Sequence, residues 1–409
     1  MKIKFLFLFV LSFTCLSVYS QFSKNANGVT IECPLANVGD TGVVDGVTYT
    51  AVDRASLITK IAAGQASECC TSLVTDMNSL FKDKTTFNSD ISHWDTSNVI
   101  NMSEMFQKAL LFNQNIGNWD TSSVNDMTFM FDRAKVFDKP INNWDVSSVT
   151  DMRYMFRGYD GQQYKFNQPL NNWDVSSVMS MEGMFATTNG DGDGDNRAFN
   201  QDIGDWDVSN VTNMAAMFKS ANEFNQDLSE WDVSKVTNIS LMFDRADDYS
   251  NGGVSLNCWD TSNITEMRFT FFRTSFNQDI SKWCVQSIGA APDGFSAVSP
   301  FDGNAAFQPL WGQPCEDRSV IISFDNETTT FGDLITVTAT SNQLGIPITY
   351  SIADTSIATI DGATGEITII KPGTTIVTAS QNDGDCISGS GNMTLTINKK
   401  DIDINADDI

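Results

Sequence analysis

Apolar residues recur in one register through the middle of the chain, with a period of about 25 residues. In each unit, Met-x-x-Met-Phe spacing places apolar side chains on one face of a short helix, as in Met102, Met105 and Phe106. An extended Phe-Asn-x-x-Ile segment then leads to a tryptophan, which aspartate follows in seven of the eight units. The tryptophans in this register are Trp94, Trp119, Trp144, Trp173, Trp206, Trp231, Trp259 and Trp283.

A polar residue stands before each predicted helix, and most of these residues are preferred N-caps. Since two helical turns are marginal alone, each unit has to pack on its neighbours. The predicted fold class is therefore an α/β repeat solenoid, leucine-rich-repeat-like, with one short strand and one short helix per coil. The residues in the N-cap position are Asp76, Asn101, Asp126, Asp151, Ser180, Asn213, Asn238 and Glu266.

The two sides of such a coil need different spacings. Neighbouring strands lie roughly 4.8 Å apart, whereas packed helices need about 8–10 Å. We therefore expect the helix side to fan out and the strand side to form a concave face. Polar columns have structural roles in this arrangement: the asparagine after each Phe bonds free backbone groups, and the aspartate after each Trp forms an Asx-turn.

The pattern changes at both ends of the repeats. A hairpin with a primed turn at Asp45-Gly46, followed by a helix capped by Asp53, predicts an N-terminal cap. Beyond the last repeat, Phe295, Phe307 and Trp311 predict a second cap, and alternating Thr, Ile and Val then predict an all-β sandwich. The predicted boundaries are a signal peptide at 1–20, a cap at 21–67, repeats at 68–283, a cap at 284–317, a sandwich at 318–398, and a linker or the start of a further module at 399–409.

The first twenty residues resemble an export signal. Lys2 and Lys4 precede an apolar run, and small residues precede Gln21. A transmembrane helix is the alternative, although the apolar run is short. Cys15 raises lipidation as a further alternative, but the residues before it lack the usual small-residue context. We therefore expect a secreted or cell-surface protein without a transmembrane segment.

Export makes disulfides the first interpretation of the cysteines. Zinc is the rival, but Cys69 and Cys70 are adjacent rather than spaced, and His93 is the only histidine. Cys284 is expected to pair with Cys315, and Cys33 with Cys70 or Cys69. The formal charge of −26 repels phosphate backbones, so nucleic acid is excluded as a partner.

The residue before each tryptophan is variable and mostly polar. Because inward-facing residues alternate with it, this column is expected to face solvent on the concave side. It is a candidate ligand-contact surface, against the alternative of plain solvated surface. Its members are His93, Asn118, Asn143, Asn172, Asp205, Glu230 and Lys282, with Cys258 in the same position.

One acidic insertion alternates carboxylates as calcium loops do. Its candidate ligands are Asp191, Asp193, Asp195 and Asp202, although Asn196 replaces the usual glycine and no flanking helices are evident. A flexible acidic insertion is the alternative. Calcium is thus the one candidate cofactor. Because His93 is predicted to be an ordinary surface residue and no phosphate-binding loop occurs, we predict that the protein is not an enzyme.

The columns carry a family resemblance over about residues 68–317. Copies such as Phe224-Asn225-Gln226-Asp227 with Trp231-Asp232-Val233-Ser234 resemble the BspA-like leucine-rich-repeat surface proteins of bacteria. Residues 348–379 resemble a group 2 bacterial immunoglobulin-like domain. These resemblances imply an adhesin-type protein that binds extracellular protein or glycan. A structural surface-layer or stalk protein without a discrete ligand is the alternative.

Overall fold

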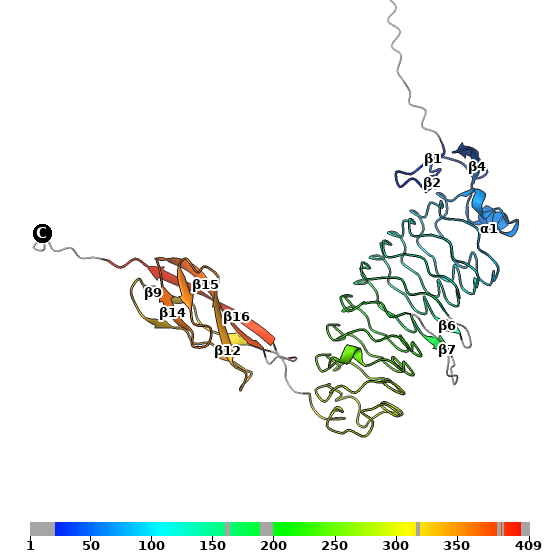
Figure 1. Ribbon diagram of the computed structural model, residues 1–409. Coiled ribbons are helices and arrows are strands. Elements are labelled where there is room, and N and C mark those ends of the chain that lie inside the picture. Colours follow the sequence, from blue (N-terminus) through cyan, green and yellow to red (C-terminus); the bar gives the residue numbers. More distant parts are fainter. Residues whose placement is uncertain are drawn as a thin grey trace, which may run out of the picture.

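The computed structural model describes residues 21–159, 164–188, 199–315, 320–382, 386 and 388–401. Figure 1 shows three parts in chain order: a small cap with the helix α1, a stack of coils, and a β-rich C-terminal region. In the described residues, α1 (Arg54–Ala62) is the only α-helix, and the remaining regular elements are strands, mostly short, and two 3-10 helices.

The Met-x-x-Met-Phe segments are series of turns, not helices. The second residue after each first methionine adopts a positive φ, for example 55° at Glu104 and 55° at Ala216. A left-handed residue cannot continue a right-handed helix. In most coils a second such residue follows, as at Lys108. Each segment is therefore built from consecutive tight turns.

Alternate amides in this segment bond in two directions. The Glu104 amide donates to the Thr128 carbonyl of the next coil at 2.8 Å, whereas the Met105 amide donates back to Met102 at 3.2 Å. One-residue parallel bridges also join successive coils, beginning with Asp76 to Asn101. Hydrogen bonds between coils thus replace the helical ladder, which in so short a helix would leave most end groups unpaired.

The predicted N-caps form Asx-turns instead. The Asn101 side-chain oxygen accepts the Ser103 amide at 2.8 Å, and Asp126 accepts the Thr128 amide at 2.9 Å. The same short polar residues serve both structures, because each needs an oxygen that accepts an amide two or three residues onward. This shared chemistry explains why the sequence pattern resembled a helix start.

The predicted α/β repeat solenoid of the leucine-rich-repeat type is therefore wrong. The coils contain neither the predicted helix nor a regular strand beside it, and the described chain is mostly β with several small sheets. The predicted fan is also wrong. Phenylalanine rings on the supposed helix side are spaced 5.4–5.8 Å between coils, closer than the 5.9–6.2 Å of the supposed strand side. Without helices, that side has no reason to spread.

Three aromatic columns form the interior of the stack. Trp119 lies 6.4 Å from Trp144 with ring planes 1° apart, and Phe106 lies 5.5 Å from Phe131. Within a coil, the rings of Phe106 and Phe112 are 3.9 Å apart. These side chains are buried together with the methionine column in one continuous cluster.

Each tryptophan also bonds to the coil before it. The Trp119 indole N–H donates to the Ile91 carbonyl at 3.2 Å, and that of Trp144 to Ile116 at 3.0 Å. The bond recurs at all eight positions. Tryptophan suits this position because it fills a large apolar volume and offers one donor to an otherwise free backbone carbonyl.

Polar columns complete the coils. The Asn113 side-chain oxygen accepts the Asp138 amide of the next coil at 3.0 Å. Asp120 accepts the Ser122 amide at 3.1 Å, which is the predicted Asx-turn after tryptophan. Where the Phe-Asn pair is missing, Tyr249 takes the phenylalanine position, with its ring 3.9 Å from Phe243. This coil also contains the 3-10 helix η2 (Asn251–Gly253).

The N-terminal cap covers the first coil. One sheet pairs β1 (Ser23–Lys24) with β2 (Ile31–Glu32). A second sheet contains β3 (Thr41–Val44), β4 (Val47–Ala51) and β5 (Cys69–Cys70). The 3-10 helix η1 (Ala66–Glu68) follows α1, which begins after the predicted N-cap Asp53. The Arg54 guanidinium donates to the Asp76 and Asn78 carbonyls at 2.8 and 2.7 Å, which satisfies acceptors that no preceding coil covers.

The last coil is covered by edge-on rings. Phe295 meets Phe271 at 5.6 Å and 88°, and Trp311 meets Phe295 at 5.1 Å and 85°. Phe307 packs beside them. These are the three predicted cover residues; Phe301, which the sequence analysis did not single out, joins them 5.7 Å from Phe271. Within the stack, β6 (Gly158–Tyr159) pairs in parallel with β7 (Thr187–Thr188).

The described residues from 320 to 398 form strands and no helix. Their main sheet has the order β12-β15-β16-β9, and its long hairpin pairs β15 with β16. The second sheet is β10-β14-β13, and β11 pairs with β8. The bounds are β8 Ile322–Ser323, β9 Glu327–Thr330, β10 Ile335–Thr336, β11 Thr340–Ser341, β12 Ile348–Ile352, β13 Ala358–Ile360, β14 Glu366–Ile369, β15 Gly373–Asn382 and β16 Ser388–Asn398.

Three disulfides join described cysteines. Cys33 bonds Cys70, which decides between the two partners considered, and Cys69 is a buried free thiol. Cys284 bonds Cys315, the expected pair. The third bond, Cys258–Cys386, was not predicted and ties the stack to the C-terminal region. In the part of the chain that the structure describes, no helix is long and apolar enough to cross a membrane.

Candidate functional site

The column before the tryptophans lies at the corner of a tight turn. In the unit around Trp119, the Trp119 amide donates to the Ile116 carbonyl at 3.1 Å, so Asn118 stands at the third position of a β-turn rather than in a strand. Five of the seven predicted contact residues are exposed. These five, called the polar column below, are Asn118, Asn143, Asn172, Asp205 and Glu230.

The remaining positions of the same column differ. His93 is half-buried, with Nε2 3.2 Å from the Cys69 carbonyl and its ring 5.2 Å from Tyr49, and burial lowers its pKa. Lys282 is also half-buried, and its amide donates to the Asn257 side chain at 3.0 Å. Cys258 is used for the disulfide. A continuous contact surface over all eight coils is therefore not formed.

The predicted calcium loop falls mostly outside the described residues. Asp191, Asp193 and Asp195 belong to that undescribed segment, so the structure does not test their role. Asp202 is described, and its carboxylate accepts the Gly204 amide at 3.0 Å in an Asx-turn. No group of three or more metal-ligating side chains is found within the described ranges.

A second surface feature was not predicted. Phe129, Arg133, Tyr154, Arg157 and Tyr159 form what we call the aromatic–arginine cluster, on the turn segments of two successive coils. The Phe129 and Tyr154 rings lie 4.9 Å apart. The Arg157 guanidinium lies 4.6 Å from the Tyr154 ring centre, and that of Arg133 lies 4.7 Å from Tyr159. Such cation–π geometry fixes both partners in place.

A buried carboxylate holds the arginines of the cluster. Asp132 is fully buried and accepts two bonds from Arg157, Nε to Oδ1 at 2.9 Å and Nη2 to Oδ2 at 3.1 Å. Gln107 of the preceding coil donates to the same carboxylate at 2.8 Å. This bidentate pair places the guanidinium plane firmly. Asp132 thereby balances the charge of Arg157, whereas Arg133 Nε lies 3.7 Å from the same carboxylate and makes no hydrogen bond to any described residue.

Tyr154 is positioned from two sides. Its hydroxyl donates to Glu182, and burial together with that carboxylate raises its pKa to about 12. Below the ring lies Gly183, at φ 58°, where an added Cβ would come within 2.4 Å of the ring. The missing side chain therefore leaves room for the ring; the conformation alone does not require glycine, since Ala216 has a φ of 55° at the equivalent position. Tyr154 thus stays neutral and fixed while its ring remains partly open to solvent.

The exposed ring of Tyr159 and the half-buried rings of Phe129 and Tyr154 offer apolar surface beside guanidinium groups. Such a surface suits a ligand that presents both C–H groups and hydroxyls, because stacking and hydrogen bonding act together. Sequence reasoning missed it because the two variable positions in Met-x-x-Met were assigned to a helix. The available signal was the aromatic pair Phe129 and Tyr154 at equivalent positions of consecutive units.

Comparison with known families gives one match. A family model described as "Mycoplasma protein of unknown function, DUF285" matches residues 53–164, 160–255 and 251–307. Together the matches span more than half of the chain and include the cap helix, the coils and the aromatic–arginine cluster. Its description names neither BspA nor a leucine-rich repeat, so that resemblance stays a prediction. No curated protein matches the chain.

Proposed function

Because the chain belongs to the DUF285 family, whose function is unknown, we propose a function from its own surface: an exported binding protein whose coils hold an extracellular glycan or protein. The aromatic–arginine cluster is the observation that carries this proposal. Its faces are fixed by Asp132, Glu182 and Gly183 before any ligand arrives, and such preorganisation lowers the entropic cost of binding.

The charge of the molecule narrows the ligand class. With a net charge of −26 and with Arg157 paired to Asp132, the molecule repels polyanions. A neutral glycan, with flat C–H faces and many hydroxyls, fits the cluster best. The polar column adds hydroxyl-matching groups, since asparagine offers both donor and acceptor.

Export is part of the same proposal. Three disulfides fit an oxidising, extracellular environment, where such bonds persist. The basic and apolar start of the chain supports export through a signal peptide. We place the protein outside the cell, secreted or attached to the surface.

A glycan array with the purified protein tests the proposal. Tyr159→Ala removes an exposed ring that contacts Arg133 but leaves the bonds between Arg157 and Asp132 in place, and it should weaken binding about tenfold, as loss of one stacked aromatic does at other interfaces. Phe331→Ala, an exposed ring in the C-terminal region, is the matched control and should leave binding unchanged. Equal loss in both variants, or none in Tyr159→Ala, would refute the cluster as the site.

The polar column needs a separate variant. Replacing Asn118, Asn143 and Asn172 together by alanine should weaken capture if the column contacts ligand, because these exposed amides have no role in the core. Unchanged capture would assign them to plain solvated surface.

A structural spacer is the second candidate function. The Cys258–Cys386 bond favours it, since a covalent tie between the stack and the C-terminal region suits a rigid stalk. Sedimentation analysis separates the two candidates. A saturable glycan partner supports binding, whereas concentration-dependent self-assembly without any partner supports the stalk.

A further inference from the structure

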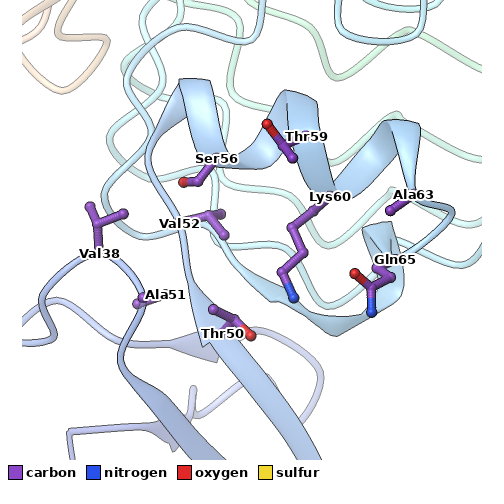
Figure 2. A pocket seen from close by; sticks show the side chains of 10 residues that line it. Val38, Thr50, Ala51, Val52, Ser56, Thr59, Lys60, Ala63 and Gln65 are labelled. Atoms are coloured by element: carbon purple, nitrogen blue, oxygen red, sulfur yellow. The ribbon is translucent and has the colours of Figure 1, made fainter.

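The N-terminal cap contains a pocket unrelated to the coil surface. It lies between β4 and α1 and has a volume of about 330 Å³ (Figure 2). Val38, Ala51, Val52 and Ala63 supply apolar walls. This volume is at the small end of the range for ligand pockets, about 300–1,000 Å³, so the occupant has to be small.

The pocket floor is rigid. Ala51 and Val52 are fully buried, the Ala51 amide donates to the Asp40 carbonyl at 2.9 Å, and the Val52 amide donates to Cys70 at 3.1 Å. Cys70 is itself held by its disulfide to Cys33. A backbone fixed in this way keeps the pocket open without a ligand.

One charged group faces this apolar space. Lys60 is the only charged residue lining the pocket, and Figure 2 shows its side chain running from α1 toward β4. No ion pair of Lys60 occurs among the residues that the structure describes. In a chain this acidic, a lysine without a carboxylate partner beside an apolar cavity indicates a site for an external anion.

Three of the other polar side chains of the lining, those of Ser56, Thr59 and Gln65, already have partners. Ser56 completes the capping box with Asp53. The Thr59 hydroxyl donates to the Ala55 carbonyl at 3.2 Å. The side-chain amide of Gln65 donates to the Glu68 carboxylate at 3.1 Å. The lining contains no carboxylate to receive a ligand ammonium. Amines and zwitterionic amino acids are therefore disfavoured, because their buried ammonium would lack a counter-charge.

We propose that this pocket binds a small aliphatic monocarboxylate. Its hydrocarbon chain lies against the exposed Val38 and Ala63, over the buried floor of Ala51 and Val52, and its carboxylate accepts a charge-assisted bond from Lys60 Nζ. The site is independent of the glycan surface, so either proposal can fail alone.

Isothermal titration calorimetry on the purified protein with 4-methylpentanoate tests the proposal. We expect saturable binding at one site, and at least about tenfold weaker binding of 4-methylpentan-1-ol, which keeps the chain but lacks the charge. Lys60→Met should weaken carboxylate binding to a similar extent. Ala63→Leu, which fills the pocket from an exposed position, should abolish it.

Lys84→Met is the matched control, since Lys84 is exposed and does not line the pocket. It should bind as the unaltered protein does. The absence of saturable binding at low-millimolar carboxylate would overturn the proposal, as would equal affinity for acid and alcohol. Binding that survives Ala63→Leu would place the ligand elsewhere and would also overturn it. The acid–alcohol comparison needs no variant, so it holds even where a substitution disturbs folding.

Discussion

The coil stack and the C-terminal β region bury their side chains in different ways. In the stack, most coils repeat the same Trp, Phe and Met columns, and nearly all of these side chains are buried. In the described part of the C-terminal region, the buried cluster has eight members, while Leu334 and Leu344 are 93% and 92% exposed. The stack spreads its stability over many similar contacts between neighbours, whereas the β region depends on a few.

The hydrogen bonds of the stack are also spread over many neighbouring coils, whereas those of the β region are concentrated in a few places. Coils exchange bonds with the coil before and after, so each interface depends on its immediate neighbours. The β region relies on the long hairpin of β15 and β16, with ten paired positions, and on the covalent tie to Cys258. Local damage should therefore open the stack around one coil, but loosen the β region as a whole.

Removing one interior indole has the largest expected effect, and it tests whether damage to the stack stays local. Trp144→Ala should cost about 3–5 kcal/mol, because it leaves a large cavity between Trp119 and the next coil. Hydrogen exchange should show lost protection in the stack near Trp144 and unchanged protection in residues 320–398. Trp144→Phe keeps a ring but leaves the Ile116 carbonyl unpaired, so it should cost only about 1–3 kcal/mol. Equal loss of protection in both regions would contradict the neighbour-only picture.

Cutting the covalent tie comes next in size. Cys258→Ser with Cys386→Ser opens a link across 128 residues, and such a loss typically costs about 2–4 kcal/mol. Calorimetry should show the β region unfolding at a lower temperature while the stack transition stays in place. Cys69→Ser, at the buried free thiol of the cap, controls for cysteine replacement alone. If the double variant melts as the unaltered protein does, the β region is stable without its tether.

Two adjacent alanines give the smallest and most diagnostic effect. Ala216 has a φ of 55°, whereas Ala215 is not in the left-handed region. Ala216→Gly should stabilise the protein by about 0.5–1 kcal/mol by relieving strain, and Ala215→Gly should destabilise it by a similar amount. In a helix both changes would destabilise by about 1 kcal/mol. Denaturant melts of the two variants thus distinguish turns from helix, and destabilisation by both would restore the helical interpretation.

The interior was predictable because the repeat period alone places equivalent residues of successive coils next to one another. Burial of Trp94 and the role of Asp120 in an Asx-turn followed from position in the unit, and the aromatic cover at Phe295 followed from the need to close the end of the stack. The turns were not predictable in this way. Left-handed geometry at Glu104 has no signature in side-chain chemistry, and bonds between coils depend on a neighbour 24 residues away.

The candidate site shows the same limit. Asn118 and Asn143 are exposed as predicted, but they lie in β-turns and not in the alternating strand from which the prediction was made. The contact of Arg157 with Tyr154 depends on turn geometry within the unit, and its anchor Asp132 belongs to the coil before. The Cys258–Cys386 bond depends on how two regions meet, which no repeat pattern contains.

The indole bond gives the array a polarity. In each coil, a backbone carbonyl accepts the indole N–H of the following coil, and the coil's own indole N–H donates to the preceding coil. The interfaces between coils are therefore alike. If a segment such as 120–144 were deleted, the indole of the following coil would donate to the equivalent carbonyl of an earlier coil. The length of the stack is thus set by the number of units: recombination can insert or delete entire units, while the two specialised ends remain unchanged.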